Sequence, residues 1–282
     1  MTEEKQYKRR GYTITGHMVV KNEDRWIWFS IMSVIDFVDK LYVYDTGSRD
    51  KTKKIIETVI NSCAEYKNKI TYKEMSNVHY KSFYSIRQDQ ISNTDTDYFM
   101  VIDGDEIWWD KSLHEIDELI KNSRPLLIAT RFINCCGDVF HYRNSSRETY
   151  SIAGIIGNIT IRVYSMKING IACSGEYGKE GFVDSTGEMV QSRGYEIKVM
   201  DNPYLHMSLL NRSSRQLGDY FVIYRKDKLH THWDAEFPEN FKYPEVFYED
   251  RPKIVRDPFK KDYNILHNMF NMWHVFKGII KG

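Results

Sequence analysis

The sequence predicts an α/β protein with a mostly parallel central sheet flanked by helices. Between residues 12 and 102, strand patterns alternate with helix patterns, as parallel sheets require because a crossover must separate neighbouring strands. The last strand of this series, 98–102 (YFMVI), is apolar without alternation. That pattern is typical of a central strand that is covered on both faces.

The elements of this series can be assigned in order. The predicted strands are residues 12–20, 40–44, 69–74 and 98–102. The predicted helices are residues 25–38, 55–63 and 82–93, where apolar side chains recur at helical spacing.

The rhythm changes after residue 125. Residues 126–133 and 159–165 predict two further strands, with a hairpin near Gly137-Asp138. Residues 169–194 are rich in glycine and charge, so we expect an irregular loop there.

The C-terminal part predicts helices, at residues 207–227 and 263–280. We therefore expect a main α/β domain over residues 1–206 and a C-terminal helical extension, 207–282, packed on it. The 263–280 helix has an apolar stripe with lysines around it, so peripheral contact with a membrane is the alternative use of this surface.

Composition excludes several classes of protein. The 40 basic and 39 acidic residues leave a net charge of +1, which argues against a nucleic-acid-binding protein. The four cysteines form no CxxC pair, which favours free thiols in a reducing compartment. The sequence lacks a signal peptide and any apolar run of about 18 residues, so we expect a cytoplasmic protein.

The acidic cluster Asp103-Gly104-Asp105 directly follows the buried strand. Ligands of open parallel sheets bind beyond the carboxyl ends of the strands. Both carboxylates can face one side while Gly104 lets the backbone turn tightly. An ordinary acidic turn is the alternative, but adjacent carboxylates repel each other unless a cation joins them. Because Mn²⁺ and Mg²⁺ prefer oxygen ligands, the cluster predicts a site for one of these ions and a diphosphate.

Two neighbouring features have alternative interpretations. Asp45 ends the strand at 40–44, where its carboxylate can accept hydrogen bonds from a base or a ribose, whereas Ser48 or Asp50 fits a helix cap. Trp108-Trp109 predicts either a wall that stacks on a sugar or ordinary core packing.

Two segments carry a resemblance to a known family. GHMVVKNEDRWIWFSIMSVIDFVDKLYVYDTGSRDKT resembles the opening of the family 2 glycosyltransferases, which have the GT-A fold. FYSIRQDQISNTDTDYFMVIDGDEIW resembles their next signature, with Ile86-Arg87-Gln88 in place of Ala-Arg-Asn. The match covers roughly residues 12–110 as an ordered set of motifs.

The resemblance implies a metal-dependent enzyme that moves a sugar from a nucleotide-sugar donor, UDP-linked, to a protein, glycan or lipid acceptor. It assigns donor binding to Lys21, Asn22, Glu23, Asp45, Arg87, Asp103 and Gly104. It assigns the Mn²⁺ or Mg²⁺ to Asp103, Asp105 and His206, the last from a Tyr-Leu-His-Met segment similar to a later family motif.

An inverting transfer also needs a carboxylate that takes the proton of the acceptor. Many relatives carry Gly-x-x-His-Glu near the acceptor, and residues 169–176 lack its histidine. The candidates are Glu176, taken first, Glu180 and Asp184, with exposed loop charges as the alternative interpretation of all three. If none fits, a retaining mechanism becomes the alternative.

Two other functions stay open at this stage. One is a nucleotidyltransferase that acts on a sugar phosphate and releases pyrophosphate. The other is a non-catalytic module that binds nucleotide-sugars or glycans, which metal-dependent donor hydrolysis lost on Asp105→Ala would exclude.

Overall fold

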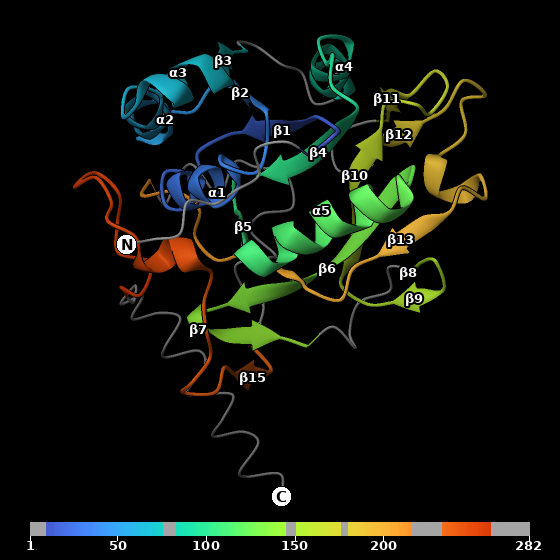
Figure 1. Cartoon of the computed structure of the whole chain (residues 1–282). Coiled ribbons are helices and arrows are strands. Elements are labelled where there is room, and N and C mark those ends of the chain that lie inside the picture. The colour runs from blue at the N-terminus through green and yellow to red at the C-terminus, as the bar shows by residue number, and fades with distance from the viewer. Residues whose placement is uncertain (1–9, 76–82, 145–150, 176–179, 216–232, 261–282) are drawn as a thin grey trace, which may run out of the picture.

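The computed structural model describes residues 10–75, 83–144, 151–175, 180–215 and 233–260 (Figure 1). An 11-stranded sheet runs through it in the order β15-β7-β6-β10-β4-β1-β2-β3, with β5, β13 and β14 joined at its side. The predicted class, a central and mostly parallel sheet flanked by helices, is confirmed.

The N-terminal part contains the predicted alternation. Its strands are β1 (Ile14–Val20), β2 (Lys40–Asp45), β3 (Ile70–Glu74) and β4 (Tyr98–Asp103), all parallel. Its helices are α1 (Ile27–Val34), α2 (Thr52–Ile60), α3 (Ala64–Lys69) and α4 (Tyr84–Ser92). Helix α1 is shorter than the predicted 25–38 at both ends, where the chain forms turns: the N–H of Trp26 donates to the carbonyl oxygen of Glu23, and the N–H of Phe37 donates to that of Val34.

The order β3-β2-β1-β4 creates a topological switch point. The chain adds β2 and β3 on one side of β1 and then returns with β4 on the other side. The register sets Val20 beside Asp45 and Val19 beside Asp103, so three strand ends meet at one edge. Such switch points are where open α/β sheets bind ligands.

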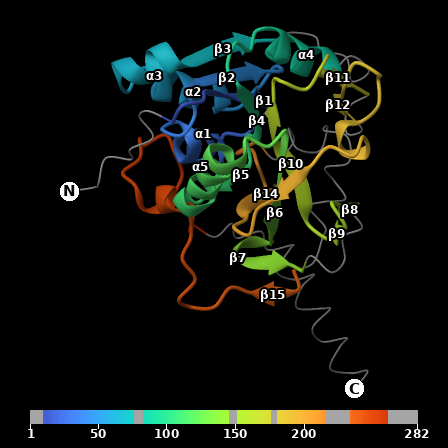
Figure 2. The same ribbon diagram turned by 45° about the vertical axis from the view of Figure 1, so that its right-hand side comes forward.

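Strand β4 is buried on both faces, as its unbroken apolar run predicts. Met100 and Ile102 pack in the core under α1 and α2, whereas Phe99 and Val101 pack in a second core with residues of α4 and the β11–β12 hairpin. In Figure 2, α1 and α5 lie on the left of the sheet and this hairpin on the right.

The second half of the sheet is mixed. Its longer elements are β5 (Glu106–Trp108), α5 (Asp110–Ser123), β6 (Leu127–Cys136), β7 (Asp138–Arg143), β10 (Ile159–Ser165), β13 (Ile197–Val199) and β14 (Tyr204–Leu209). Shorter ones are β8 (Ser151–Ile152), β9 (Ile155–Ile156), β11 (Ala172–Ser174), β12 (Gly181–Val183), η3 (Val190–Ser192), β15 (Ala235–Glu236) and η4 (Glu245–Tyr248). The predicted hairpin is confirmed, since Cys136 pairs with Asp138 across Gly137.

Three sequence interpretations need correction. Helix α5 was not among the predicted elements, although Leu113, Ile116 and Ile120 are spaced for one buried face. The supposed loop at 169–194 contains the β11–β12 hairpin and η3. Residues 207–209 belong to β14 rather than to a helix, because β14 pairs with β5 and β6.

The C-terminal helical extension stays a prediction. Among the described residues after 206, the structure has β14, β15 and η4 and no α-helix. Residues 216–227 and the 263–280 helix, with its proposed membrane contact, lie outside the described residues, and the division at residue 206 also stays a prediction. No helix within the described ranges combines the length and apolarity needed to cross a bilayer.

Two side-chain predictions are settled by burial. Trp108 and Trp109 are both buried, and Trp108 stacks on Tyr204 with ring centroids 4.7 Å apart, so they pack in the core instead of forming an open wall. All four cysteines are free, with Cys63 exposed and the other three buried.

Candidate functional site

Charged side chains gather where β1, β2 and β4 end. Asp103 is the last residue of β4, and two arginines from other elements bind its carboxylate. Arg87 of α4 donates to Oδ1 over 3.0 Å, and Arg162 of β10 donates to Oδ2 over 3.2 Å. Burial raises the pKa of Asp103, but Arg162 and Arg87 outweigh it and lower the pKa below its ordinary value. The Asp103 side chain is still 36% exposed, so it can also contact a ligand.

Helix α4 positions Arg87 close to the end of β4. Ile86, Gln90 and Ile91 bury one face of the helix, and Arg87 is buried beside them. The Arg87 Nη1 donates to the carbonyl oxygen of His17 in β1 over 3.1 Å. The guanidinium is therefore held by β1 as well as by Asp103.

Arg162 links Asp103 to the fully buried carboxylate of Glu106. It donates to Oε1 of Glu106 and, over 3.2 Å and 3.0 Å, to the hydroxyl of Tyr204. Burial alone lowers the pKa of Arg162, but Glu106, Tyr204 and Asp103 raise it well above its ordinary value. Arg162 is thus a permanent cation under the acidic cluster.

Asp105 lies on the other side of the cluster, close to His206. The Nε2 of His206 is 3.5 Å from Oδ1 of Asp105, and both side chains are largely buried. The backbone N–H of Met207 donates to the carbonyl oxygen of Asp105 over 2.8 Å, which ties β14 to the acidic loop. Two of the three predicted metal ligands are therefore brought together by strand pairing.

These residues fit a divalent cation only in part. Within the described ranges, no group of three or more His, Cys, Asp and Glu side chains is arranged to hold a metal ion. Both oxygens of Asp103 bind arginines, whereas Oδ1 of Asp105 faces His206. Mg²⁺ and Mn²⁺ commonly take one or two protein ligands and complete their shell with water and phosphate oxygens, so a site of this kind would need no protein ligands beyond Asp105 and His206.

A further arginine faces the same carboxylate. The Nη1 of Arg212 is 2.6 Å from Oε1 of Glu23 and 3.7 Å from Oδ2 of Asp105. Glu23 is held at the end of β1 by its own N–H, which donates to Oγ1 of Thr52 over 2.7 Å.

Gly104 is required by close packing. A Cβ at this position would lie 2.9 Å from Cγ of Glu23 and 3.1 Å from Cγ1 of Val20. The glycine thus lets Glu23 lie directly over the acidic loop, at the turn between β4 and β5.

The loop after β2 lies beside the end of β1. Oδ1 of Asp45 accepts from the N–H groups of Gly47 and Ser48, and Oδ2 accepts from the hydroxyl of Tyr72 over 3.3 Å. Asp45 therefore caps its own loop, a contact that the predicted base or ribose would share with it.

Asn22 links this loop to β1. Its φ of 55° lies in the left-handed region, and its Oδ1 accepts from the N–H of Arg49 over 2.8 Å. Its own N–H donates to Oγ of Ser48 over 2.8 Å. Lys21, beside it, is exposed.

The three candidate bases have different environments. Glu176 lies outside the described residues. Asp184 is buried, and its oxygens accept from Thr186, Arg193 and Tyr195. Hydrogen bonds from Thr186 are the main cause of its pKa falling far below the ordinary value, so Asp184 is a poor proton acceptor.

Glu180 is the candidate with unused hydrogen-bonding capacity. Among the residues that the structure describes, its buried Oε2 has no hydrogen-bond partner. It directly precedes β12, which pairs with β11, and Cys173 of β11 donates its backbone N–H to Oε1 of Gln88, the neighbour of Arg87. This chain of contacts connects the β11–β12 hairpin to the helix that carries Arg87.

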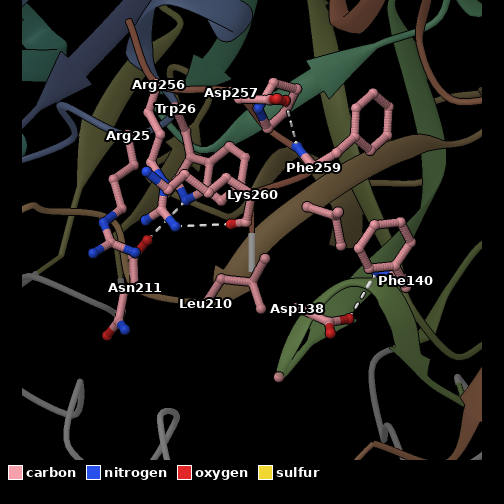
Figure 3. Close-up of a pocket in the computed structure, with 13 residues that line it drawn as sticks. Arg25, Trp26, Asp138, Phe140, Leu210, Asn211, Arg256, Asp257, Phe259 and Lys260 are labelled. Carbon is pink, nitrogen blue, oxygen red and sulfur yellow. Dashed lines mark hydrogen bonds between the residues drawn. The ribbon is translucent and has the colours of Figure 1, made fainter. Parts of the chain in front are cut away.

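A separate pocket lies between α1, β7 and the C-terminal segment (Figure 3). Its lining includes Trp26, Asn211 and Arg256 and none of the predicted site residues. Several of its polar groups are already engaged: the Trp26 Nε1 donates to the carbonyl oxygen of Asn211, and Arg256 donates to that of Lys260. The pocket is thus distinct from the acidic cluster.

Sequence reasoning left Arg162, Tyr204 and Arg212 out of the site. Tyr204 stands in the Tyr-Leu-His-Met segment that is similar to a later family motif, which is the signal that could have found it. Nothing in the local sequence marks Arg212, because its partners lie far away in the chain.

The sequence model described as glycosyl transferase family 2 matches residues 17–196. No curated protein sequence is detectably similar to the chain.

Solved structures give distant similarities. S. aureus TarS, residues 1–349, is 15% identical with a TM-score of 0.47, and the match covers 70% of this chain and 60% of that one. Glucosyl-3-phosphoglycerate synthase from Mycobacterium tuberculosis, solved with Mn²⁺, UDP and glucosyl-3-phosphoglycerate, is 16% identical with a TM-score of 0.40, covering 62% of this chain and 67% of that one. The chain thus spans less than two thirds of the TarS fragment. The family match covers well over half of the chain, from within β1 through β4, the acidic cluster and β10. The chain therefore belongs to glycosyl transferase family 2.

Proposed function

We propose that the protein transfers a sugar from a UDP-linked donor to an acceptor, with inversion at the sugar and with the help of Mn²⁺ or Mg²⁺. The observation that carries this proposal is the meeting of Asp105 and His206 beside the arginine-bound Asp103, at the switch point of the sheet. The family membership supports the same class of reaction.

In this proposal Asp105 and His206 hold the cation. The bound cation would neutralise charge on the diphosphate as it leaves. Asp103, presented by Arg87 and Arg162, accepts hydrogen bonds from sugar or ribose hydroxyls, because its exposed carboxylate is held ionised by the two guanidinium groups.

The nucleotide lies along the ends of β1 and β2. Asp45 and Asn22 line this wall, and Lys21 supplies an exposed positive charge beside it. Gly104 keeps Glu23 close to the acidic loop that carries Asp105.

Glu180 is the base that we propose for the acceptor hydroxyl. Its buried Oε2 has no hydrogen-bond partner within the described part of the chain, whereas the oxygens of Asp184 are held by three side chains. A carboxylate with an unused lone pair can take the proton as the acceptor oxygen attacks the sugar. Glu176 remains a second candidate.

The test is hydrolysis of a panel of UDP-sugars, with and without Mn²⁺, by the wild type and Asp105→Asn. We expect metal-dependent release of UDP that falls about 100-fold or more in Asp105→Asn, while the melting temperature stays within a few degrees. Asp184→Asn serves as the matched control for loss of a carboxylate outside the metal pair. Release of pyrophosphate from a nucleoside triphosphate and a sugar phosphate would instead identify a nucleotidyltransferase, and donor binding without turnover would identify a binding module.

A further inference from the structure

The segment after β14, residues 210–215, is tied across the donor-side loops, and we call it the strap. Ser213 Oγ donates to Oδ2 of Asp50 over 2.6 Å. Ser214 donates its backbone N–H to Oδ1 of Asp24 over 2.6 Å and its hydroxyl to Oδ2 of the same carboxylate. Two carboxylates from the loops at α1 and α2 thus hold two successive residues of the strap.

Backbone contacts hold the strap on both sides of these serines. The N–H of Arg25 donates to the carbonyl oxygen of Arg212 over 3.0 Å. Trp26 Nε1 donates to the carbonyl oxygen of Asn211 over 2.9 Å, a contact visible in Figure 3. Arg215 Nη1 donates to the carbonyl oxygen of Arg49 over 2.6 Å. Arg212 is therefore anchored through its neighbours before and after it.

This anchoring presents the Arg212 guanidinium to two buried carboxylates. Its Nη1 lies 2.6 Å from Glu23 and 3.7 Å from Asp105, and each of these carboxylate side chains is only 4% exposed. Burying a carboxylate costs free energy unless a cation is close to it, so Arg212 stabilises the carboxylates of Glu23 and Asp105. Oδ1, the other carboxylate oxygen of Asp105, faces His206.

We infer that Arg212 is an internal counter-ion that competes with the divalent cation for Asp105. This inference rests on the proposed function. It means that the free protein binds the cation weakly, and binds it tightly only together with the donor diphosphate. A divalent cation bound at Asp105 and His206 meets a positive charge across the same carboxylate, and like charges so close oppose each other. The diphosphate relieves this repulsion by adding negative charge, while Glu23 keeps Arg212 in place.

The experiment measures Mn²⁺ affinity by electron paramagnetic resonance, on the full chain without nucleotide and with UDP. Removal of the charge in Arg212→Gln is expected to tighten Mn²⁺ binding without nucleotide about tenfold. The tightening of Mn²⁺ binding by UDP should shrink correspondingly, because the coupling between two ligands is reciprocal. Arg212→Met is a second neutral variant in case the glutamine variant does not fold.

Arg215→Gln is the matched control. It removes one positive charge from the same strap, but among the described residues its guanidinium donates to the carbonyl oxygen of Arg49. We expect its Mn²⁺ affinity to change less than twofold, and Asp105→Asn to abolish Mn²⁺ binding. A further readout is the rise in melting temperature on adding Mn²⁺, which should be larger in Arg212→Gln than in the wild type.

The outcomes separate this inference from the proposed function. If Mn²⁺ binds the wild type in the presence of UDP but neutral Arg212 variants do not tighten binding without UDP, the inference is overturned and the metal site stands. An equal gain in Arg215→Gln would also overturn it, by showing a general charge effect. If no variant binds Mn²⁺ with or without UDP, the metal-dependent function itself fails.

Discussion

Arg162 is the residue whose loss should cost the fold most. It lies against Glu106, whose side chain is fully buried, and also reaches Asp103 and the hydroxyl of Tyr204. Removing one partner from a buried ion pair leaves an uncompensated charge, which typically costs about 3–5 kcal/mol.

We therefore expect Arg162→Met to lower the free energy of unfolding by about 3–5 kcal/mol, measured by urea denaturation. Lys40→Met is the control, because the pair between Lys40 and Asp95 is well exposed to solvent and should contribute little to stability. Equal losses in the two variants would contradict a special role for the buried pair.

Gly104 should affect ligand affinity more than stability. In Gly104→Ala the new methyl group meets Cγ of Glu23 at 2.9 Å, so that side chain has to move away from Arg212 and Asp105. We expect donor affinity to fall about tenfold with a stability loss of about 1–3 kcal/mol from overpacking, read from titration calorimetry and thermal melting. Gly16→Ala, where the methyl group meets Cδ1 of Leu41 at 2.6 Å in the core, is the comparison that should lower stability without selective loss of donor affinity.

At the scale of elements, one histidine joins β7 to β15. His141 Nδ1 contacts Oδ1 of Asp138, and Nε2 lies 3.3 Å from Oε1 of Glu236. The hydrogen bond with Asp138 is the main cause that raises the pKa of His141 above 6.5.

This shift makes part of the stability depend on pH. A group with a raised folded-state pKa contributes stability that is fully present below its unfolded pKa of about 6.5 and is lost as pH rises through the folded pKa. We expect the free energy of unfolding to fall by on the order of 1 kcal/mol as pH rises from 6 through the folded pKa, and this fall to be absent in His141→Gln. The same slope in both proteins would assign the effect to other groups.

Pairing between elements also decides how distant site residues come together. β14 sets His206 opposite Glu106 of β5, and thereby close to Asp105, although about 100 residues separate the two site residues. Helix α4, in contrast, was predictable, since Ile86 and Ile91 mark its buried face and Arg87 lies between them.

For the whole molecule, binding of donor and metal should appear as a gain in stability. A ligand at 100 times its dissociation constant stabilises the folded state by about 2.7 kcal/mol, which for a chain of this size is a rise of roughly 5–10 °C in melting temperature. We expect UDP with Mn²⁺ to give such a rise, and either component alone to give clearly less. Equal rises with and without Mn²⁺ would contradict metal-dependent donor binding.

The sequence by itself determined the parallel half of the sheet and the edge at which the site lies. Local spacing of apolar residues reports burial directly, so β1, β2, β3 and β4 were predictable, and with them the position of Asp45 and of the acidic cluster. Only the tertiary structure decided how the charges of that cluster are balanced. The sequence argument required a cation between Asp103 and Asp105, whereas the fold brings Arg87 and Arg162 to the first and Arg212 with His206 to the second. Electrostatic partners act through space over a few ångströms, and no pattern along the chain records which distant arginine arrives there.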